Sequence, residues 1–130
     1  MKRVPGALPQ RIARAVTVLK LPWGVKEVRL QLVGPMTGLP DFNYPLFNEV
    51  AARLRAEGHQ VWNPAEENLL GETWSRCMRE SLAALQVAEA VVLLPNWAHS
   101  RGANLEVETA LALDIPIIPW AAWDNLAIMP

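Results

Sequence analysis

The chain has 130 residues, of which 52% are hydrophobic and 19% charged. This composition suits one globular domain and excludes a disordered chain. The single cysteine, Cys77, excludes an internal disulfide and a thiolate zinc cluster. No apolar run reaches the roughly 20 residues of a membrane helix, and the start lacks the apolar core of a signal peptide. We therefore expect a cytoplasmic protein without membrane contact.

The net charge of −1 conceals an uneven distribution of charge along the chain. Residues 1–29 carry seven Lys and Arg against one acid, which gives +6, and the remainder carries five against twelve, which gives −7. Basic arms can bind nucleic acid, but these charges are spread out and almost free of interleaved aromatics. We expect 1–25 to be a solvated extension, or one that packs against the acidic body of a neighbouring subunit, and we do not expect nucleic acid as a partner.

From residue 27 onward, hydrophobic patterning of two kinds alternates along the chain. Period-two alternation or a continuous apolar run predicts strands at 27–33, 59–63, 88–94 and 115–119. Apolar residues spaced by three and four predict helices at 46–57, 74–86 and 103–113. Thr73 is a plausible N-cap, and Gly58 stands where helices favour a left-handed residue.

This order predicts one small doubly wound α/β domain over residues 26–120, followed by a C-terminal tail at 121–130. Strands that alternate with helices form a parallel, Rossmann-like sheet in a three-layer α/β/α arrangement. In such sheets, ligands bind beyond the carboxyl ends of the strands. The turn Gly34–Gly38 and the segment Ser100–Glu106 therefore belong to the same edge, and we expect them to form one pocket.

The first candidate feature is the turn Gly34-Pro35-Met36-Thr37-Gly38. Its two glycines allow a ligand to approach the backbone, whose free N–H groups can hold phosphate or sugar oxygens. The turn is neither a dinucleotide fingerprint nor a P-loop. By itself, it fits a plain structural turn equally well.

The second candidate feature is the segment Ser100–Glu106 at the start of the last long helix. Ser100 and Gly102 stand where backbone donors and the helix dipole favour anions, and Glu106 lies about one turn further. The alternative is that Glu106 merely stabilises the helix dipole. Trp97 either walls the pocket or packs at its rim. His59 is expected to be structural, and His99 is expected to be a loop residue and not a general base. No metal-ligand spacing occurs, so we expect no metal and no cofactor.

Several motifs between residues 27 and 120 resemble a small uncharacterised family that is common in bacterial viruses and prophages. That family looks like a branch of the nucleoside 2-deoxyribosyltransferase superfamily, which also holds nucleoside-5′-monophosphate N-glycosidases. The resemblance is carried by Gly34–Gly38, Asp41–Pro45, Arg53–His59, Asn63-Pro64, Leu94–Trp97, Ser100-Arg101-Gly102 and Glu106.

The resemblance implies an enzyme that cleaves the N-glycosidic bond of a nucleoside or nucleotide. It makes Glu106 the nucleophile that attacks the anomeric carbon of the sugar, and it assigns Ser100 and Gly102 to the 5′ end or its phosphate. A glycosyl-enzyme ester would form, and water or another base would then take the sugar. Superfamily enzymes often complete their site across a subunit interface, so the resemblance also implies a homo-oligomer, a dimer or higher.

Two of the expected substrate-binding positions depart from the superfamily pattern. Gln31 stands where relatives often carry a tyrosine, and Ser81 where relatives carry an aspartate that orients the sugar. Glu80 is adjacent, but one residue along a helix turns the side chain by about 100°. These departures keep a second hypothesis open, a nucleotide-binding module without turnover. The basic extension, with Trp120 and Trp123, suggests a third, a structural or interaction protein.

Overall fold

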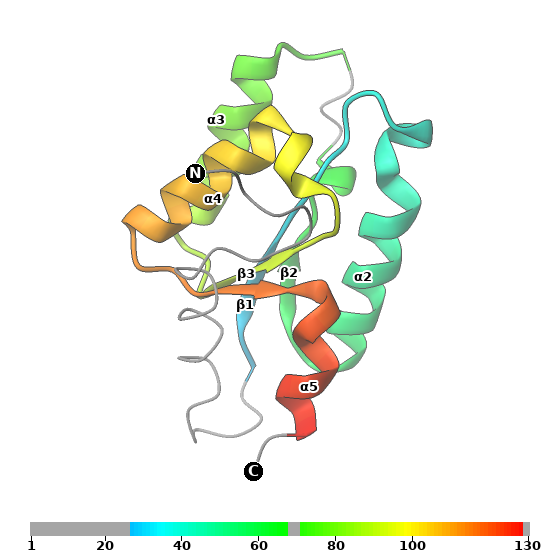
Figure 1. Ribbon diagram of the computed structural model, residues 1–130, viewed down its shortest axis with the longest axis vertical. Coiled ribbons are helices and arrows are strands. Elements are labelled where there is room, and N and C mark those ends of the chain that lie inside the picture. Colours follow the sequence, from blue (N-terminus) through cyan, green and yellow to red (C-terminus); the bar gives the residue numbers. More distant parts are fainter. Residues whose placement is uncertain (1–26, 68–70, 129–130) are drawn as a thin grey trace, which may run out of the picture.

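The computed structural model describes residues 27–67 and 71–128. Strands and helices alternate along this part of the chain, as the sequence predicts (Figure 1). The strands are β1 (Arg29–Val33), β2 (Gln60–Trp62), β3 (Ala90–Leu93) and β4 (Ile117–Pro119). The helices are α2 (Tyr44–Ala56), α3 (Trp74–Leu85), α4 (Arg101–Ala112) and α5 (Trp123–Ile128). None of the helices in these described ranges is long and apolar enough to cross a membrane.

The four strands form one parallel sheet in the order β2-β1-β3-β4. Helices α2 and α5 lie on one side of the sheet and α3 and α4 on the other (Figure 1), which confirms the predicted small α/β fold. The chain steps from β1 outward to β2 and then returns to place β3 on the other side of β1. The strand order therefore reverses between β1 and β3, which is where open α/β sheets leave a crevice for ligands.

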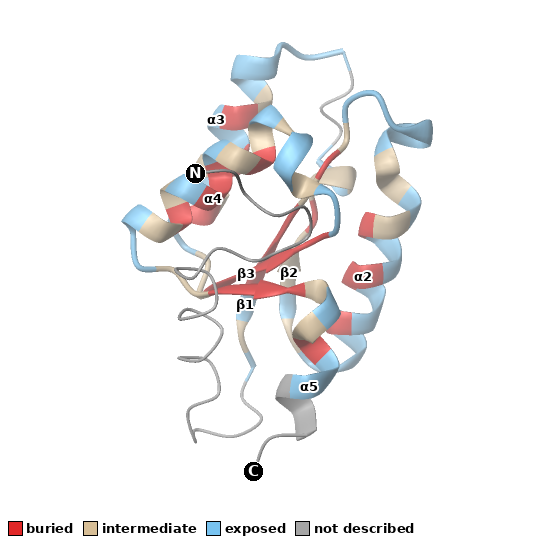
Figure 2. Ribbon diagram, viewed as in Figure 1, coloured by how far each residue is buried: buried red, intermediate tan, exposed pale blue. Residues whose placement is uncertain are grey.

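The sheet divides the hydrophobic core into two clusters. Leu30 and Leu32 of β1 pack with α2 and α5, whereas Val33 packs with α3 and α4. All four residues of β3 are buried (Figure 2), which confirms the prediction of a central strand covered on both faces. Gln31 alternates with the two leucines, so its amide projects toward α3 and α4.

The predicted helix caps are present, and two helices begin earlier than the hydrophobic pattern indicates. Thr73 Oγ1 accepts a hydrogen bond from the Arg76 N–H at 3.1 Å, and Gly58 has φ +98°. Helix α2 begins at Tyr44 because Pro45 fits the first turn, where its missing N–H is not needed. Helix α4 begins at Arg101, directly after its N-cap Ser100.

The segment predicted as a C-terminal tail begins with a short 3₁₀ turn (Trp120–Ala122) that leads into α5. Trp123 is only 9% exposed and belongs to the core cluster under α2. Its indole N–H donates to Glu57 Oε1 at 3.2 Å, and the Arg53 guanidinium lies 5.0 Å above the ring of Trp120. Both tryptophans therefore hold the C-terminal segment onto α2. The predicted extension at 1–25 lies outside the described residues.

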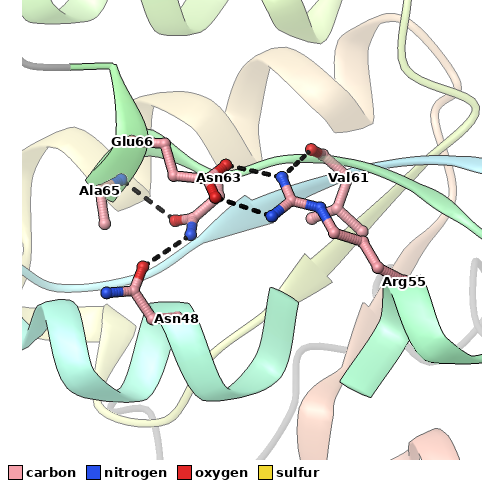
Figure 3. A network of polar contacts seen from close by, with 6 residues as sticks. All are labelled: Asn48, Arg55, Val61, Asn63, Ala65 and Glu66. Carbon is pink, nitrogen blue, oxygen red and sulfur yellow. Dashed lines mark hydrogen bonds and ion pairs between the residues drawn. The ribbon is translucent and has the colours of Figure 1, made fainter. Parts of the chain in front are cut away.

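A polar network fixes the loop after β2 (Figure 3). The Asn63 side chain is buried; its Oδ1 accepts from the Ala65 N–H at 3.1 Å and its Nδ2 donates to Asn48 Oδ1 at 3.0 Å. Nearby, Arg55 donates to both carboxylate oxygens of Glu66, at 2.7 and 2.6 Å, and to the Val61 carbonyl at 2.9 Å. The Asn63-Pro64 motif thus anchors this loop to α2.

Candidate functional site

A cavity of about 800 Å³ opens at the carboxyl edge of the sheet. Its walls come from the loops that follow β1 and β3 and from the first turns of α2, α3 and α4. This is the point at which the strand order reverses, so the topology and the cavity agree on the location of a ligand site. The volume lies within the range of small-molecule sites, roughly 300–1,000 Å³.

The Gly34–Gly38 turn is partly a wall of this cavity and partly a packing element. Pro35 and Thr37 line the cavity. Met36 packs instead against the core under α2. A Cβ at Gly34 would lie 2.8 Å from Leu94 Cβ, so glycine is required for the close approach of two chain segments. Gly38 has φ +83°, where a side chain would be strained.

The lip of the cavity next to this turn has an unusual backbone. Asp41, Phe42 and Asn43 are consecutive residues with φ of 52°, 53° and 60°, in the left-handed region that costs a non-glycine residue about 1–2 kcal/mol. Asn43 Nδ2 donates to the Pro35 carbonyl at 3.0 Å and so ties this segment to the turn. The sequence marks the segment only as a loop, because single positions do not reveal three left-handed residues in a row.

The opposite wall is the start of α4. Ser100 Oγ accepts from the Ala103 N–H at 3.1 Å and so caps the helix, while its hydroxyl proton is left to donate to a ligand. Gly102 allows α4 to approach α3 closely, because a Cβ there would lie 3.1 Å from Met78 Sδ. Ser100 and Gly102 both line the cavity, as the sequence predicts.

One cationic side chain, Arg101, lies on this wall. The Arg101 guanidinium lies 3.7 Å from the centroid of the Trp74 ring, and both residues line the cavity together with His99. No Asp or Glu is among the described residues that line it. With the N-terminus of α4 alongside, the electrostatics of this wall favour an anionic ligand.

Glu106 lies one helical turn beyond Gly102, in a buried polar cluster that joins β1, α3 and α4. The exposed fractions are 8% for Glu106, 6% for Ser81 and 0% for Gln31. Gln31 Nε2 donates to the Ser81 carbonyl at 2.9 Å and also approaches Ser81 Oγ at 3.3 Å and Glu106 Oε2 at 3.5 Å. Three positions that the sequence singles out are therefore brought into direct contact.

Burial controls the charge of Glu106. Loss of solvent raises its pKa from 4.5 to about 7, although hydrogen bonds from Ser81 and Gln31 act in the opposite direction. Glu106 forms no ion pair among the described residues. At neutral pH both protonation states are populated, which suits a carboxyl group for nucleophilic or proton-transfer chemistry.

Glu106 lies close to the cavity without lining it. On α4, Gly102 and Glu106 are four residues apart, and on α3, Met78 and Ser81 are three apart, so each pair shares a helix face. The Met78 side chain packs against Gly102, one turn nearer the cavity than the Ser81–Glu106 pair. A flexible methionine side chain therefore packs next to Gly102, which lines the cavity, on the same face of α3 as Ser81.

Trp97, an expected site residue, and two residues that were not expected in the site, Glu80 and His59, all lie away from the cavity. Trp97 packs against the core between the sheet and α4 and does not line the cavity. Glu80 is exposed and forms an ion pair with Arg76, with Nε and Oε1 3.3 Å apart, so it faces away from the Gln31 cluster. His59 Nδ1 accepts from the Val28 N–H at 3.1 Å, a structural role.

Trp74 and Asn43 also line the cavity, although the sequence pattern did not predict them there. Trp74 directly follows the predicted N-cap Thr73, and the first turn of a helix at this sheet edge faces the crevice. An aromatic residue there, opposite the first turn of the next helix, was the signal that could have found it.

The fold and the site together define a small doubly wound α/β domain with a buried carboxyl group beside a cavity at its topological switch point. The chain belongs to the family described as Domain of unknown function (DUF4406), whose model matches residues 28–119. The match spans the strands β1 to β4 and both walls of the cavity. No curated protein matches the sequence.

Proposed function

We propose that this protein is an N-glycosidase, or a related deoxyribosyltransferase, that acts on a nucleoside or nucleotide with Glu106 as its nucleophile. The observation that carries the proposal is the position of Glu106: a buried carboxyl group with a raised pKa, one turn below a cavity lined by Ser100, Gly102 and Thr37. The link from the family to the nucleoside 2-deoxyribosyltransferase superfamily is part of this proposal. The occurrence of the family in bacterial viruses and prophages is also part of this proposal, and so is a homo-oligomeric assembly of this chain.

The chemistry follows from the two halves of the site. The cavity holds the nucleotide, with its 5′ end against Ser100 and the first turn of α4. The Glu106 carboxylate attacks C1′, the bond from C1′ to the base nitrogen breaks, and the base leaves with that electron pair and then takes a proton from water. The resulting ester is hydrolysed by water, or the sugar is passed to a second base.

The test is a release assay. Wild-type protein is incubated with the common nucleosides and their 5′-monophosphates, ribo and deoxyribo, and free base is measured by chromatography. We expect base release by the wild type and none by Glu106→Ala. The matched control is Glu108→Ala, which removes an exposed carboxylate from the same helix and should retain release. No release from any substrate, or equal release by the Glu106 variant, would contradict the proposal.

A specific observation favours a second candidate, a nucleotide-binding module without turnover. Glu106 does not line the cavity, and Gln31 and Ser81 bind to it where the superfamily pattern has a tyrosine and an aspartate. Calorimetry separates the two candidates, because a binding module shows nucleotide binding that Arg101→Ala weakens, with no base release. Trp120 and Trp123, which suggested an interaction protein, are engaged in packing within the domain.

A further inference from the structure

We propose that Gln31 determines sugar specificity: its Oε1 accepts a hydrogen bond from the 2′-hydroxyl of a ribonucleotide, so the site prefers ribose to 2-deoxyribose. This inference rests on the proposed function, whose reaction it makes more specific. It concerns an atom whose role neither the family match nor the resemblance assigns.

The observation behind it is an unpartnered polar atom. Gln31 is fully buried, and its Oε1 is the one buried side-chain N or O atom in the described residues that has no hydrogen-bond partner. An unsatisfied buried acceptor costs about 1–3 kcal/mol, and native proteins tolerate few of them. The amide cannot simply be reversed, because Nε2 donates to the Ser81 carbonyl at 2.9 Å and a carbonyl only accepts.

The unpartnered atom is next to the proposed nucleophile. Nε2 and Oε1 are bonded to the same carbon, and Nε2 lies 3.5 Å from Glu106 Oε2. A hydroxyl that approaches Glu106 on the Gln31 side therefore comes within reach of Oε1. Since Oε1 only accepts, the missing partner must be a donor, which a hydroxyl group provides.

The stereochemistry of the reaction identifies that hydroxyl. In the common nucleosides the base projects from one face of the sugar ring, and the 2′-hydroxyl of ribose projects from the opposite face. A nucleophile that displaces the base must enter from that opposite face. Glu106 and the 2′-hydroxyl therefore lie on the same face of the sugar. Gln31, which lies beside Glu106, is the side chain that contacts this hydroxyl.

The sugar reaches this position by displacing Met78. That side chain packs against Gly102, one helical turn nearer the cavity than the Ser81–Glu106 pair. Methionine has three rotatable bonds and fits irregular spaces, so it can change rotamer at modest cost. Once it moves, Glu106 and Gln31 become the floor of the cavity, and the ligand supplies the partner that Oε1 lacks.

A purely structural role explains Gln31 less well. An apolar side chain of similar size would fill the same space between the sheet and α3 without leaving an acceptor unsatisfied. The amide also differs from the superfamily's tyrosine in offering an acceptor that carries no proton. A pocket built to bind a substrate hydroxyl rejects analogues without it more strongly than a hydrophobic pocket distinguishes shapes.

The experiment compares three substrates that differ only at C2′: the ribonucleoside 5′-monophosphate, its 2′-deoxy counterpart and its arabino epimer, whose hydroxyl lies on the base's face. The base is the one that wild-type protein releases fastest. We expect the ratio of kcat/KM for the ribo substrate to kcat/KM for the 2′-deoxy substrate to be about tenfold higher in wild type than in Gln31→Leu or Gln31→Met, which corresponds to one hydrogen bond. Comparing this ratio between wild type and the variants cancels the intrinsic effect of an electronegative group at C2′, which slows cleavage of ribo substrates in every variant alike. Thermal unfolding checks that each variant folds.

Ser81→Ala is the matched control, because it removes the neighbouring polar group and leaves Oε1 in place. It should lower the rates for all three substrates alike and keep the ribo preference. Calorimetry with Glu106→Ala should show the same preference in binding, without turnover. Base release with the same ribo-to-deoxy ratio in wild type and in Gln31→Leu would overturn this inference and leave the proposed function standing. No base release from any substrate would overturn both.

Discussion

Two polar clusters lie on opposite sides of the sheet. They differ in burial, in the direction in which the pKa of their carboxyl group is shifted, and in whether their polar atoms are all hydrogen-bonded. The Arg55–Glu66 pair, next to Asn63, faces solvent, and the hydrogen bond from Arg55 lowers the pKa of Glu66 below its usual value (Figure 3). The Glu106 cluster lies in the core, where burial raises the pKa to about 7 and Gln31 Oε1 has no partner. The first cluster is satisfied and anchors a loop. The second leaves one buried acceptor without a partner among the described residues.

The largest expected difference between the clusters is in activity. Glu106→Ala should lower base release by at least about 1,000-fold, because removing a nucleophile leaves only binding and orientation. Glu66→Ala should leave the rate within about twofold, since Glu66 does not line the cavity. Initial rates at saturating nucleotide, with circular dichroism to verify folding, provide the measurement. A strong loss of base release in Glu66→Ala, or no loss in Glu106→Ala, would contradict the assignment of Glu106 as the nucleophile and of Glu66 as a structural residue.

Stability should depend on pH through Glu106. Its pKa is raised on folding, from 4.5 to about 7, so its stabilising contribution is complete below pH 4.5 and is lost as the pH rises through 7. Glu106→Gln mimics the protonated form. We expect this variant to exceed wild type by about 2–3 kcal/mol in free energy of unfolding at pH 8.5, and to approach it near pH 4.5.

Urea denaturation at the two pH values measures this difference. Glu66→Gln is the control with the opposite sign, because its carboxylate is stabilised by Arg55 and its loss should destabilise the protein slightly at high pH. If Glu106→Gln were no more stable than wild type at pH 8.5, Glu106 would not carry the raised pKa.

Much of the fold could be predicted from the sequence because hydrophobic patterning and breaker residues are local signals. The buried run at Ala90–Leu94 identified the central strand, and Thr73 and Gly58 marked helix ends. The C-terminal helix was missed because no periodic pattern of useful length precedes the end of the chain, and its stability comes from Trp123 packing against α2.

The site could be predicted only in part, for a physical reason. The order of strands and helices places Thr37, Ser100 and Gly102 at one sheet edge, and all three line the cavity. Whether Glu106 opens into that cavity depends on side-chain packing between α3 and α4, which no local signal encodes. In the structure Met78 packs against Gly102, and Gln31 and Ser81 form hydrogen bonds to Glu106.

Asn63 should account for most of the stability of the solvent-facing cluster. Its buried side chain satisfies the Ala65 N–H and Asn48 Oδ1, so Asn63→Ala leaves both without this partner. We expect a loss of about 1–2 kcal/mol in free energy of unfolding with unchanged catalysis. A change in kcat or KM larger than the loss of folded protein explains would show that this loop also serves the site.

The smallest effect should come from the Arg55–Glu66 pair. Both side chains are more than two-fifths exposed, and solvent screening limits such pairs to about 1 kcal/mol or less. A double-mutant cycle with Arg55→Ala and Glu66→Ala should give a coupling in this range that declines in 1 M salt. A coupling well above 1 kcal/mol that resists salt would place this pair in a less solvated environment than the structure shows.

Detection of the covalent intermediate tests the role of Glu106 most directly. A nucleotide bearing fluorine at C2′ slows hydrolysis of a glycosyl-enzyme ester, so wild-type protein incubated with it should gain the mass of one fluorinated sugar phosphate. Peptide mapping by mass spectrometry should place that mass on Glu106, and Glu106→Ala should gain none. Release of the base from the ordinary nucleotide, with the added mass on another residue or absent, would contradict the assignment of Glu106 as the nucleophile.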